Sequence, residues 1–186
     1  IRVLNAMKSI PREEFFPKRI KDFAYLNSAF DIGYGQTISQ PYIVAVMCEE
    51  LDLKGSEVVL DIGTGSGYLA AILSKLCKKV ISVEIVPELV KISKERFEKL
   101  GLKNIKVIHG NGRDGYIKGS PYDRIVCSAV SKGIPEAWRE QLKDGGTILI
   151  PLYVNGIQEL FRARKIGDRY DIKALAHVKF VPLVDR

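Results

Sequence analysis

The sequence predicts an α/β fold: a doubly wound, mostly parallel sheet with an antiparallel strand pair at its C-terminal end, sandwiched between helices. Three observations predict this fold. Short apolar runs alternate with helical patterns between residues 58 and 152, which is typical of a parallel sheet. A turn with three glycines, residues 63–67, follows the first of these runs. Further along, two strand-like stretches flank Gly167-Asp168-Arg169, which is a hairpin signal.

Length and composition indicate one globular domain. The chain has 186 residues, of which 46% are hydrophobic and 27% charged, as in ordinary single domains. No linker or low-complexity tract divides it. We expect one domain, 1–186, with N-terminal helices and a loop in 1–53, a core of alternating elements in 54–152 and a C-terminal hairpin in 153–186. Because Ile1 already lies inside a helical pattern, we expect further residues before it.

Each element is predicted from its own pattern. The first residues carry Val3, Leu4 and Met7 at helical spacing, and proline and glycine then predict loop structure up to residue 40. Residues 41–53 again have helical spacing. The apolar run 58–62, which ends at a glycine, indicates a buried parallel strand. The alternation then predicts helices at 67–77, from Pro87 to a stop at Gly101, and at 136–143 ending at Gly145-Gly146; strands at 79–84, 105–109, 123–128 and 147–152; and a final hairpin of 160–166 and 172–181.

Charge and cysteine content narrow the classes of function. The formal net charge is +7, which allows nucleic-acid binding, but the basic residues are scattered and acidic residues stand between those near the C-terminus. The three cysteines are widely spaced and form no CxxC pair, so neither a zinc site nor a disulfide framework is expected. No apolar run approaches the roughly 20 residues that span a membrane. We expect a cytoplasmic protein, a monomer, with no nucleic-acid or membrane partner and no metal.

The glycine turn predicts a nucleotide site. Glycines let the chain turn tightly and approach a ligand, and the following helix directs its N–H groups at that ligand. The dinucleotide fingerprint needs a third glycine at position 68, which is Tyr68, and a phosphate loop needs a Gly-Lys-Ser/Thr that is absent. Gly63-Thr64-Gly65-Ser66-Gly67 after Asp61 resembles the loop of class I S-adenosylmethionine methyltransferases. Glu84, at the end of the second strand, can accept hydrogen bonds from ribose hydroxyls.

The acceptor side of the site contains few candidate bases. The stretch after the fourth strand, residues 125–131, lacks the Asn/Asp-Pro-Pro-Tyr/Phe signature of nitrogen-directed nucleic-acid enzymes. The chain has two histidines, His109 at the end of the third strand and His177 in the last, which is as readily structural, and no cluster of acids indicates a metal. A carboxylate acceptor needs no base, since a carboxyl group ordinarily has a pKa near 3.9 and is already ionised at pH 7. The candidate acceptor loop is residues 33–42, where Ser39 is either an active-site hydroxyl or the N-cap of the next helix.

Six segments together resemble the protein-L-isoaspartate (D-aspartate) O-methyltransferase family. They occur in the family's order and cover essentially the whole chain. Gly-Gln-Thr-Ile-Ser and Phe-Val-Pro-Leu are the most distinctive of the motifs. The matching segments are Ile10–Phe16, Gly33–Tyr42, Asp61–Tyr68, Glu84, Asn111–Gly115 and Phe180–Val184.

The resemblance implies a fold, a reaction and site residues. It implies a Rossmann-like fold with an unusual position for the last two strands, and transfer of a methyl group from S-adenosyl-L-methionine to the carboxylate of L-isoaspartyl residues in damaged proteins and peptides. S-adenosyl-L-homocysteine is the second product. Ser39 is implied as the catalytic hydroxyl, with Gly35, Ser39, Leu183 and Val184 at the substrate. The implied cofactor residues are Gln36, Thr37, Ile38, Asp61, Gly63, Thr64, Gly65, Gly67, Glu84, Ile85, Asn111 and Gly112.

The chain departs from the family pattern at Asn111, where the family usually has aspartate. An asparagine can still accept a bond from the adenine amino group, without the charge. Asn111-Gly112 and Asn155-Gly156 are also the dipeptides most prone to deamidation, so either site could become a substrate of the same enzyme.

Three other functions remain open at the level of sequence. The positive charge favours an RNA or DNA methyltransferase, which a steep loss of binding with salt would support. A non-catalytic S-adenosylmethionine-binding module would bind the cofactor without turnover. A methyltransferase for small carboxylic acids would share the whole cofactor site.

Overall fold

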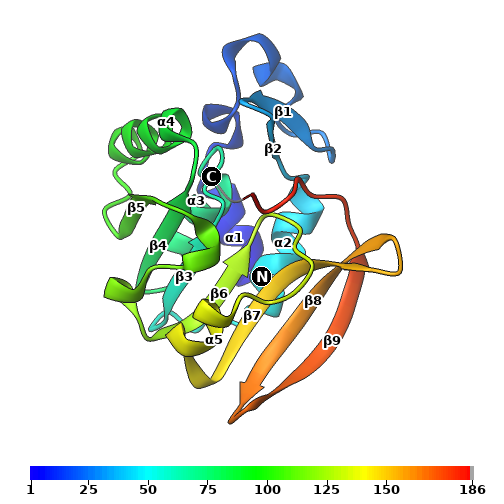
Figure 1. The fold of residues 1–186 in the computed structure, drawn as a ribbon. Helices are drawn as coiled ribbons and strands as arrows, with labels where there is room; N and C mark the ends of the chain where they lie inside the picture. Colours follow the sequence, from blue (N-terminus) through cyan, green and yellow to red (C-terminus); the bar gives the residue numbers. More distant parts are fainter. Residues whose placement is uncertain (185–186) are drawn as a thin grey trace.

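A computed structural model describes residues 1–184. Its centre is a seven-stranded sheet with the strand order β5-β4-β3-β6-β7-β8-β9 (Figure 1). Strands β5 to β7 are parallel, whereas β7, β8 and β9 are successively antiparallel. The predicted fold class is therefore confirmed. The strands are β3 (Val58–Ile62), β4 (Lys79–Glu84), β5 (Ile105–His109), β6 (Tyr122–Cys127), β7 (Leu142–Val154), β8 (Ile157–Ile166) and β9 (Arg169–His177).

Helices cover both faces of the sheet, and the sheet separates two hydrophobic cores. Successive residues of a strand point to opposite faces, so Val59 of β3 joins one core and Leu60 the other. The first core packs against α1, α2, α3 and α4, and the second packs against α5 through Trp138. These helices are α1 (Arg2–Lys8), α2 (Pro41–Glu50), α3 (Tyr68–Ser74), α4 (Pro87–Lys99) and α5 (Glu136–Gln141); short 3₁₀ turns are η1 (Arg12–Phe15), η2 (Lys18–Phe23), η3 (Gly112–Asp114) and η4 (Ile117–Gly119). None of the helices in the described part of the chain is long and apolar enough to cross a membrane.

The predicted helix boundaries agree best with the structure where a proline or glycine marks the end of the helix. Pro87 begins α4 at its first turn, and Gly101 follows its end with φ +65°. The prediction that α5 continues to residue 143 and stops at Gly145-Gly146 is wrong. The helix ends at Gln141, because the buried Leu142 already pairs with Tyr122 of β6. Gly145, with φ +73°, lies inside β7 at a register irregularity.

The C-terminal third contains two hairpins where the sequence predicted one. Asn155 and Gly156 both have positive φ and join β7 to β8 in a two-residue turn, the geometry that Asn-Gly favours. The predicted turn at residues 167–168 joins β8 to β9. The predicted final strand is too long, since β9 ends at His177.

The predicted loop before α2 contains a further hairpin. Strands β1 (Phe30–Gly33) and β2 (Gln36–Ile38) pair around Tyr34 and Gly35, which have φ +58° and +69°. The strands are short, with only Ile38 buried, so alternation of apolar residues could not identify them. In Figure 1 the hairpin projects above the upper edge of the sheet.

Candidate active site

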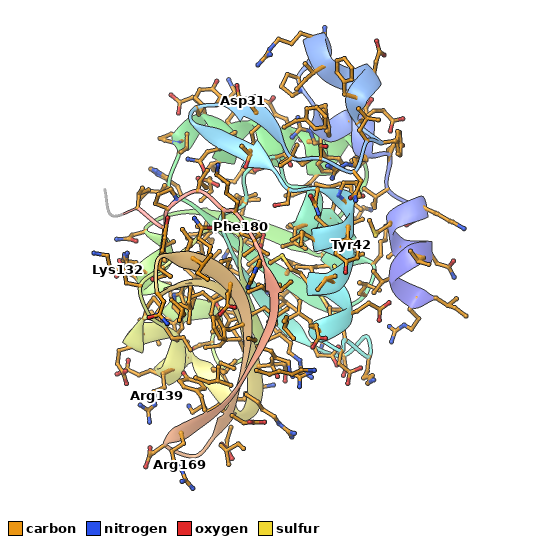
Figure 2. The ribbon with its side chains drawn as sticks, turned by 90° about the vertical axis from the view of Figure 1, so that its right-hand side faces the viewer. Asp31, Tyr42, Lys132, Arg139, Arg169 and Phe180 are labelled. Carbon is orange, nitrogen blue, oxygen red and sulfur yellow. The ribbon has the colours of Figure 1, made fainter. Side chains whose placement is uncertain are left out.

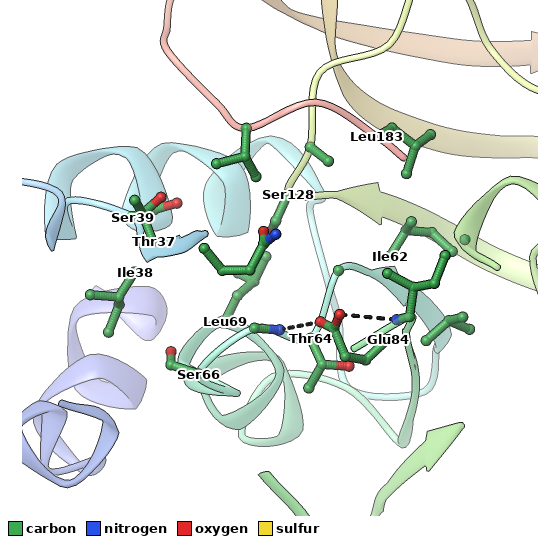
Figure 3. Close-up of a pocket in the computed structure, with 18 of the residues that line it drawn as sticks. Thr37, Ile38, Ser39, Ile62, Thr64, Ser66, Leu69, Glu84, Ser128 and Leu183 are labelled. Carbon is green, nitrogen blue, oxygen red and sulfur yellow. Dashed lines mark hydrogen bonds between the residues drawn. The ribbon is translucent and has the colours of Figure 1, made fainter. Parts of the chain in front are cut away.

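A pocket opens at the carboxyl ends of β3, β4 and β6, where ligands of doubly wound sheets bind. Four parts of the chain meet there: the end of the β1–β2 hairpin, the glycine turn after β3, the end of β4, and the C-terminal segment 181–184. Figure 3 shows Ser39 and Thr37 on one side of this pocket and Glu84 on the other. The site therefore has two sides: a hairpin side, which includes residues 36–39, and a sheet side, which includes residues 63–66 and Glu84.

The three glycines of the turn have different roles. Gly63, Gly65 and Gly67 all have positive φ, at +87°, +52° and +90°. Residues with a side chain seldom adopt such values, whereas glycine adopts them freely. Gly63 and Gly65 line the pocket. Gly67 precedes α3 and faces away from the pocket, since a Cβ built there would lie 2.7 Å from Cζ of Phe97. The first two glycines thus leave room for a ligand, and the third lets α4 pack closely.

Glu84 holds the turn together. It is 5% exposed, and its carboxylate accepts three backbone hydrogen bonds: from Gly65 N at 2.8 Å, Ile85 N at 2.9 Å and Val86 N at 3.0 Å (two of them drawn in Figure 3). A carboxylate has about four acceptor positions. Three are used within the protein, so Glu84 has room for one ribose hydroxyl more readily than for two.

Asp61 lies beneath the turn and outside the pocket lining. It is fully buried, and Oδ2 accepts a hydrogen bond from Ser82 Oγ at 2.6 Å; Ser82 Oγ in turn lies 2.5 Å from Thr64 Oγ1. No residue within 1–184 donates a hydrogen bond to Oδ1. Burial, the largest cause, and the negative charge of Glu84 together raise the pKa of Asp61 to about 7, although the Ser82 hydrogen bond acts to lower it.

The raised pKa of Asp61 predicts a fall in stability as the pH rises. Below pH 4 the carboxyl is protonated in both the folded and the unfolded chain. Between about pH 4 and about pH 7 only the unfolded chain loses the proton, so the free energy of unfolding falls by about 4 kcal/mol at most. Asp61→Asn removes this fall. Urea unfolding of the two proteins at several pH values between 4 and 8 measures it, and parallel curves would refute the prediction.

Ser39 is not the cap of α2. The N-cap residue is Gln40, and neither its side chain nor that of Ser39 bonds the first turn; instead Asn27 Oδ1 accepts a hydrogen bond from Tyr42 N at 3.1 Å. The alternative that Ser39 serves as N-cap is therefore wrong. Ser39 lines the pocket, and its hydroxyl has no hydrogen-bond partner among residues 1–184, so it is available to a ligand.

A buried arginine fixes the backbone at Ser39. Arg12, 1% exposed, donates from Nη2 to Ser39 O at 2.8 Å and from Nε to Ala24 O at 2.7 Å. Its guanidinium carbon lies 4.5 Å from the ring centre of Tyr68, which lines the pocket. One side chain therefore ties the N-terminal turns, the hairpin side and the start of α3 together.

The C-terminal segment 178–184 closes the pocket from above. Val130 and this segment exchange two backbone bonds, Val130 N to Val181 O and Leu183 N to Val130 O, each 2.8 Å. The side chain of Gln158 bonds both backbone groups of Phe180, accepting at 2.7 Å and donating at 3.3 Å. Phe180, labelled below Asp31 of the hairpin in Figure 2, packs against the first core. The segment is thus attached to the sheet along its length.

Asn111 serves as a cap. Its Oδ1 accepts a hydrogen bond from Arg113 N at 2.9 Å at the start of η3, and the residue is not part of the pocket lining. The neighbouring Gly112 does line the pocket. A Cβ built on Gly112 would lie 2.6 Å from Ile62 and 3.4 Å from Leu183, so this position admits only glycine. Of the two residues expected to contact adenine, only Gly112 therefore lines the pocket.

Most of the residues expected at the site meet in the pocket. Four do not line it: Gly35, Asp61, Gly67 and Asn111. The apolar residues that the sequence analysis missed had apolar spacing, which identifies core residues and cannot separate them from a cofactor wall, and the missed serines had no such pattern. The expected residues that line it are Gln36, Thr37, Ile38, Ser39, Gly63, Thr64, Gly65, Glu84, Ile85, Gly112, Leu183 and Val184, and those missed include Val44, Met47, Ser66, Leu69, Ser128 and Ala129.

The residues present fit S-adenosylmethionine. Gly63 and Gly65 leave space that a side chain would restrict, and Glu84 is the one carboxylate in the described pocket lining. The orphaned Oδ1 of Asp61 lies beneath the turn and outside the pocket lining, so Asp61 supports the turn and does not face a ligand directly. Residues 1–184 contain no group of three His, Cys, Asp or Glu side chains that could hold a metal ion.

Comparisons with known proteins agree with this site. The family model for protein-L-isoaspartate(D-aspartate) O-methyltransferase matches residues 1–186. A protein-L-isoaspartate O-methyltransferase of Dictyoglomus thermophilum is 48% identical over 182 residues, which are 98% of this chain and 83% of that protein.

Two solved structures share the fold. A protein-L-isoaspartate O-methyltransferase has a TM-score of 0.92 and 30% identity, over 99% of this chain and 61% of its own. A Plasmodium falciparum protein described as such an enzyme, solved in complex with S-adenosyl-L-homocysteine, has a TM-score of 0.85 and 25% identity over 98% of this chain and 90% of its own. The resemblance inferred from the motifs is confirmed: this chain belongs to the protein-L-isoaspartate(D-aspartate) O-methyltransferase family.

Proposed function

We propose that the chain transfers a methyl group from S-adenosyl-L-methionine to the free carboxylate of L-isoaspartyl residues in damaged proteins and peptides, leaving S-adenosyl-L-homocysteine. Membership of the family supports the reaction, and the relative solved with S-adenosyl-L-homocysteine supports the cofactor. The bound cofactor supplies an electrophilic methyl group on a positively charged sulfur.

The chemistry of the pocket carries this proposal. Its described lining contains hydroxyls and amides but no His, Lys or Cys side chain that could remove a proton. Glu84 is engaged by three amides, and burial raises the pKa of Tyr68, so its phenol stays protonated. A hydroxyl or amine acceptor would need a base in such a site. A carboxylate does not, because it is already ionised at pH 7.

The protein's contribution is then to position the acceptor. Ser39 Oγ, free of other partners among residues 1–184, donates a hydrogen bond to the isoaspartyl carboxylate and directs one of its oxygens at the methyl group. The N-terminus of the ten-residue α2, two positions further on, favours the negative charge. Gln36 and Thr37 border both ligands, and Leu183 and Val184 exclude water from above.

The test is methyl transfer to a matched pair of peptides, one with L-isoaspartate and one with aspartate at the same position. We expect transfer to the isoaspartyl peptide alone. Ser39→Ala lowers kcat/KM by about tenfold to a hundredfold, since a hydrogen bond to a charged group contributes about 1.5–3 kcal/mol. Ser74→Ala is the control, because that hydroxyl bonds Ala71 O on α3, outside the pocket lining, and leaves the rate unchanged.

Each other outcome points to a different function. Equal rates with Ser39→Ala would remove this residue from the mechanism while the reaction stands. No transfer to either peptide, with cofactor bound, would favour a nucleic-acid methyltransferase or a binding module.

We also propose that the enzyme acts as a monomer in the cytoplasm and binds neither nucleic acid nor membranes. The three cysteines are buried and free, which suits a reducing compartment. In Figure 2, Arg139 and Arg169 lie at the opposite end of the molecule from Asp31 of the hairpin, so these basic residues are remote from the pocket mouth. Affinity for nucleic acid that falls steeply with salt would contradict this proposal.

A further inference from the structure

We propose that Asn155 deamidates to isoaspartate and that a second copy of the enzyme then methylates it. The inference rests on the proposed function. Succinimide formation requires the amide nitrogen of the following residue to attack the side-chain carbon Cγ. A glycine in that following position offers the least steric hindrance. The chain has four such candidates: Asn111-Gly112, Asp114-Gly115, Asp144-Gly145 and Asn155-Gly156.

Burial and bonding protect the Asn111 site. Gly112 is buried, a Cβ on it would lie 2.6 Å from Ile62, and its carbonyl accepts a hydrogen bond from Trp138 Nε1 at 2.8 Å. The side-chain carbonyl of Asn111 is itself engaged by Arg113 N. Moving Gly112 N onto Cγ of Asn111 would break these contacts. This asparagine is therefore locked in its amide form.

The two aspartates are protected differently. An aspartate carboxyl is ordinarily ionised at pH 7, and an ionised carboxylate is a poor electrophile. At the Asp114 site, Gly115 packs against Gln141, whose Oε1 would lie 2.5 Å from a Cβ built on the glycine. At the other site, Asp144 Oδ1 accepts a hydrogen bond from Gly167 N at 2.7 Å.

Asn155 has none of these protections. It lies at the tip of the β7–β8 hairpin, where Tyr153 through Ile157 are all exposed. Its side chain has no hydrogen-bond partner within residues 1–184, and a Cβ built on Gly156 would meet nothing within 4 Å. Asn155, at φ +50°, and Gly156 form a two-residue turn whose residues are all exposed. No packed neighbour of Gly156 therefore has to move when its N approaches Cγ of Asn155.

The chemical steps are balanced by water and cofactor alone. Gly156 N bonds to Cγ of Asn155, and the side-chain amide leaves as ammonia. Water opens the resulting succinimide at either carbonyl, giving aspartate or isoaspartate. The isoaspartyl carboxylate then takes the cofactor's methyl group, as in the proposed reaction, and no oxidant or metal is needed.

The hairpin tip is also accessible to another molecule. Exposed apolar side chains flank the turn, at Tyr153, Val154 and Ile157. The isoaspartate adds one carbon to the main chain of a two-residue turn, which disturbs the pairing of Val154 with Ile157. The damaged tip is then an exposed, loosened segment like those of other damaged proteins.

The experiment separates the substrate from the catalyst. Ser39→Ala protein is aged at mildly alkaline pH and then mixed with fresh Asn155→Gln protein and labelled S-adenosylmethionine. Trypsin cleavage at Lys106, Arg113, Lys143 and Arg162 places Asn111 in the peptide 107–113 and Asn155 in the peptide 144–162. We expect the mass gain of an amide-to-acid exchange, followed by one methyl group, in peptide 144–162, with methyl uptake proportional to the deamidated fraction.

Controls distinguish this inference from the proposed function. Aged Ser39→Ala/Asn155→Gln protein takes up no methyl groups above the level of fresh protein. An external isoaspartyl peptide in the same tube reports whether the catalyst is active. Mass gain in peptide 107–113 in place of 144–162, or no mass gain in either, would overturn the choice of Asn155. Deamidation in 144–162 without methylation, while the external peptide is methylated, would overturn the self-repair. If the external peptide also stays unmethylated, the proposed function itself fails.

Discussion

Glu84→Gln lowers the affinity for S-adenosylmethionine at least about a hundredfold. The substitution keeps the shape of the side chain but turns one acceptor oxygen into a donor nitrogen. That nitrogen must face either Gly65 N or the pair Ile85 N and Val86 N, all of which are donors. The affinity falls because the displaced turn no longer offers the ribose its acceptor or the cofactor its glycine lining; a hydrogen bond to a charged group alone contributes about 1.5–3 kcal/mol, and about 1.4 kcal/mol is tenfold in affinity. Titration calorimetry with S-adenosylmethionine measures the change.

Glu57→Gln is the matched control for this experiment. Glu57 is also buried and also accepts two backbone hydrogen bonds, from Lys54 N and Gly55 N, each 2.9 Å. It precedes β3 at the amino end of the sheet, away from the pocket. We expect Glu57→Gln to lower the free energy of unfolding while the affinity for cofactor stays the same. Equal losses of affinity in both variants would show that Glu84 acts only on stability.

Arg12→Met lowers kcat for the isoaspartyl peptide more than about tenfold and the free energy of unfolding by about 3 kcal/mol. The variant removes two hydrogen bonds to carbonyls and leaves Ala24 O and Ser39 O without this donor. Ser39 then loses its fixed position, and a misplacement of about 1 Å at a reacting group can cost a hundredfold in rate. Arg12→Lys does not restore the rate, since an ammonium cannot span both carbonyls in one plane. Steady-state kinetics and urea unfolding measure the two effects.

Arg124→Met is the control that separates the positioning of Ser39 from the stability of the fold. Arg124 also bonds two carbonyls, Leu51 O at 2.7 Å and Asp123 O at 2.8 Å, but neither residue lines the pocket. This variant loses stability and keeps kcat. If Arg12→Met also keeps kcat at a temperature where it is folded, Arg12 is a structural residue and positions nothing.

The sequence predicts the sheet side of the site well, because its signals are local. The apolar run of β3, the glycines after it and Glu84 at the end of β4 follow one another within 27 residues, 58–84. Parallel strands in register bring such neighbours together without further information. Asp61 is the exception. Whether it faces the pocket or the layer beneath depends on the pleat, and its link to Ser82 shows that it lies beneath.

The hairpin side could not be derived in the same way. Its parts are distant in sequence: Arg12 reaches Ser39 across 27 positions, and the segment 181–184 arrives from the far end of the chain. An arginine next to a proline carries no pattern that indicates burial, since arginines are seldom buried. Ser39 was recognised through the family motif, and only the structure excludes it as a cap. The boundary at Leu142 failed for a related reason, because the pairing that ends α5 is with β6, 20 residues earlier.

The number of strands after β6 determines at which edge of the sheet the C-terminal segment emerges. A strand that runs parallel to the central four finishes at the pocket edge, and each hairpin after it reverses the direction. β7 reaches the pocket edge, β8 leaves it and β9 returns, so the residues after His177 emerge where they can cover the cofactor. An odd number of strands is therefore required for a C-terminal cover. The lengths of β8 and β9 and the turn at 167–168 can vary in related chains, but strands can be gained or lost here only in pairs.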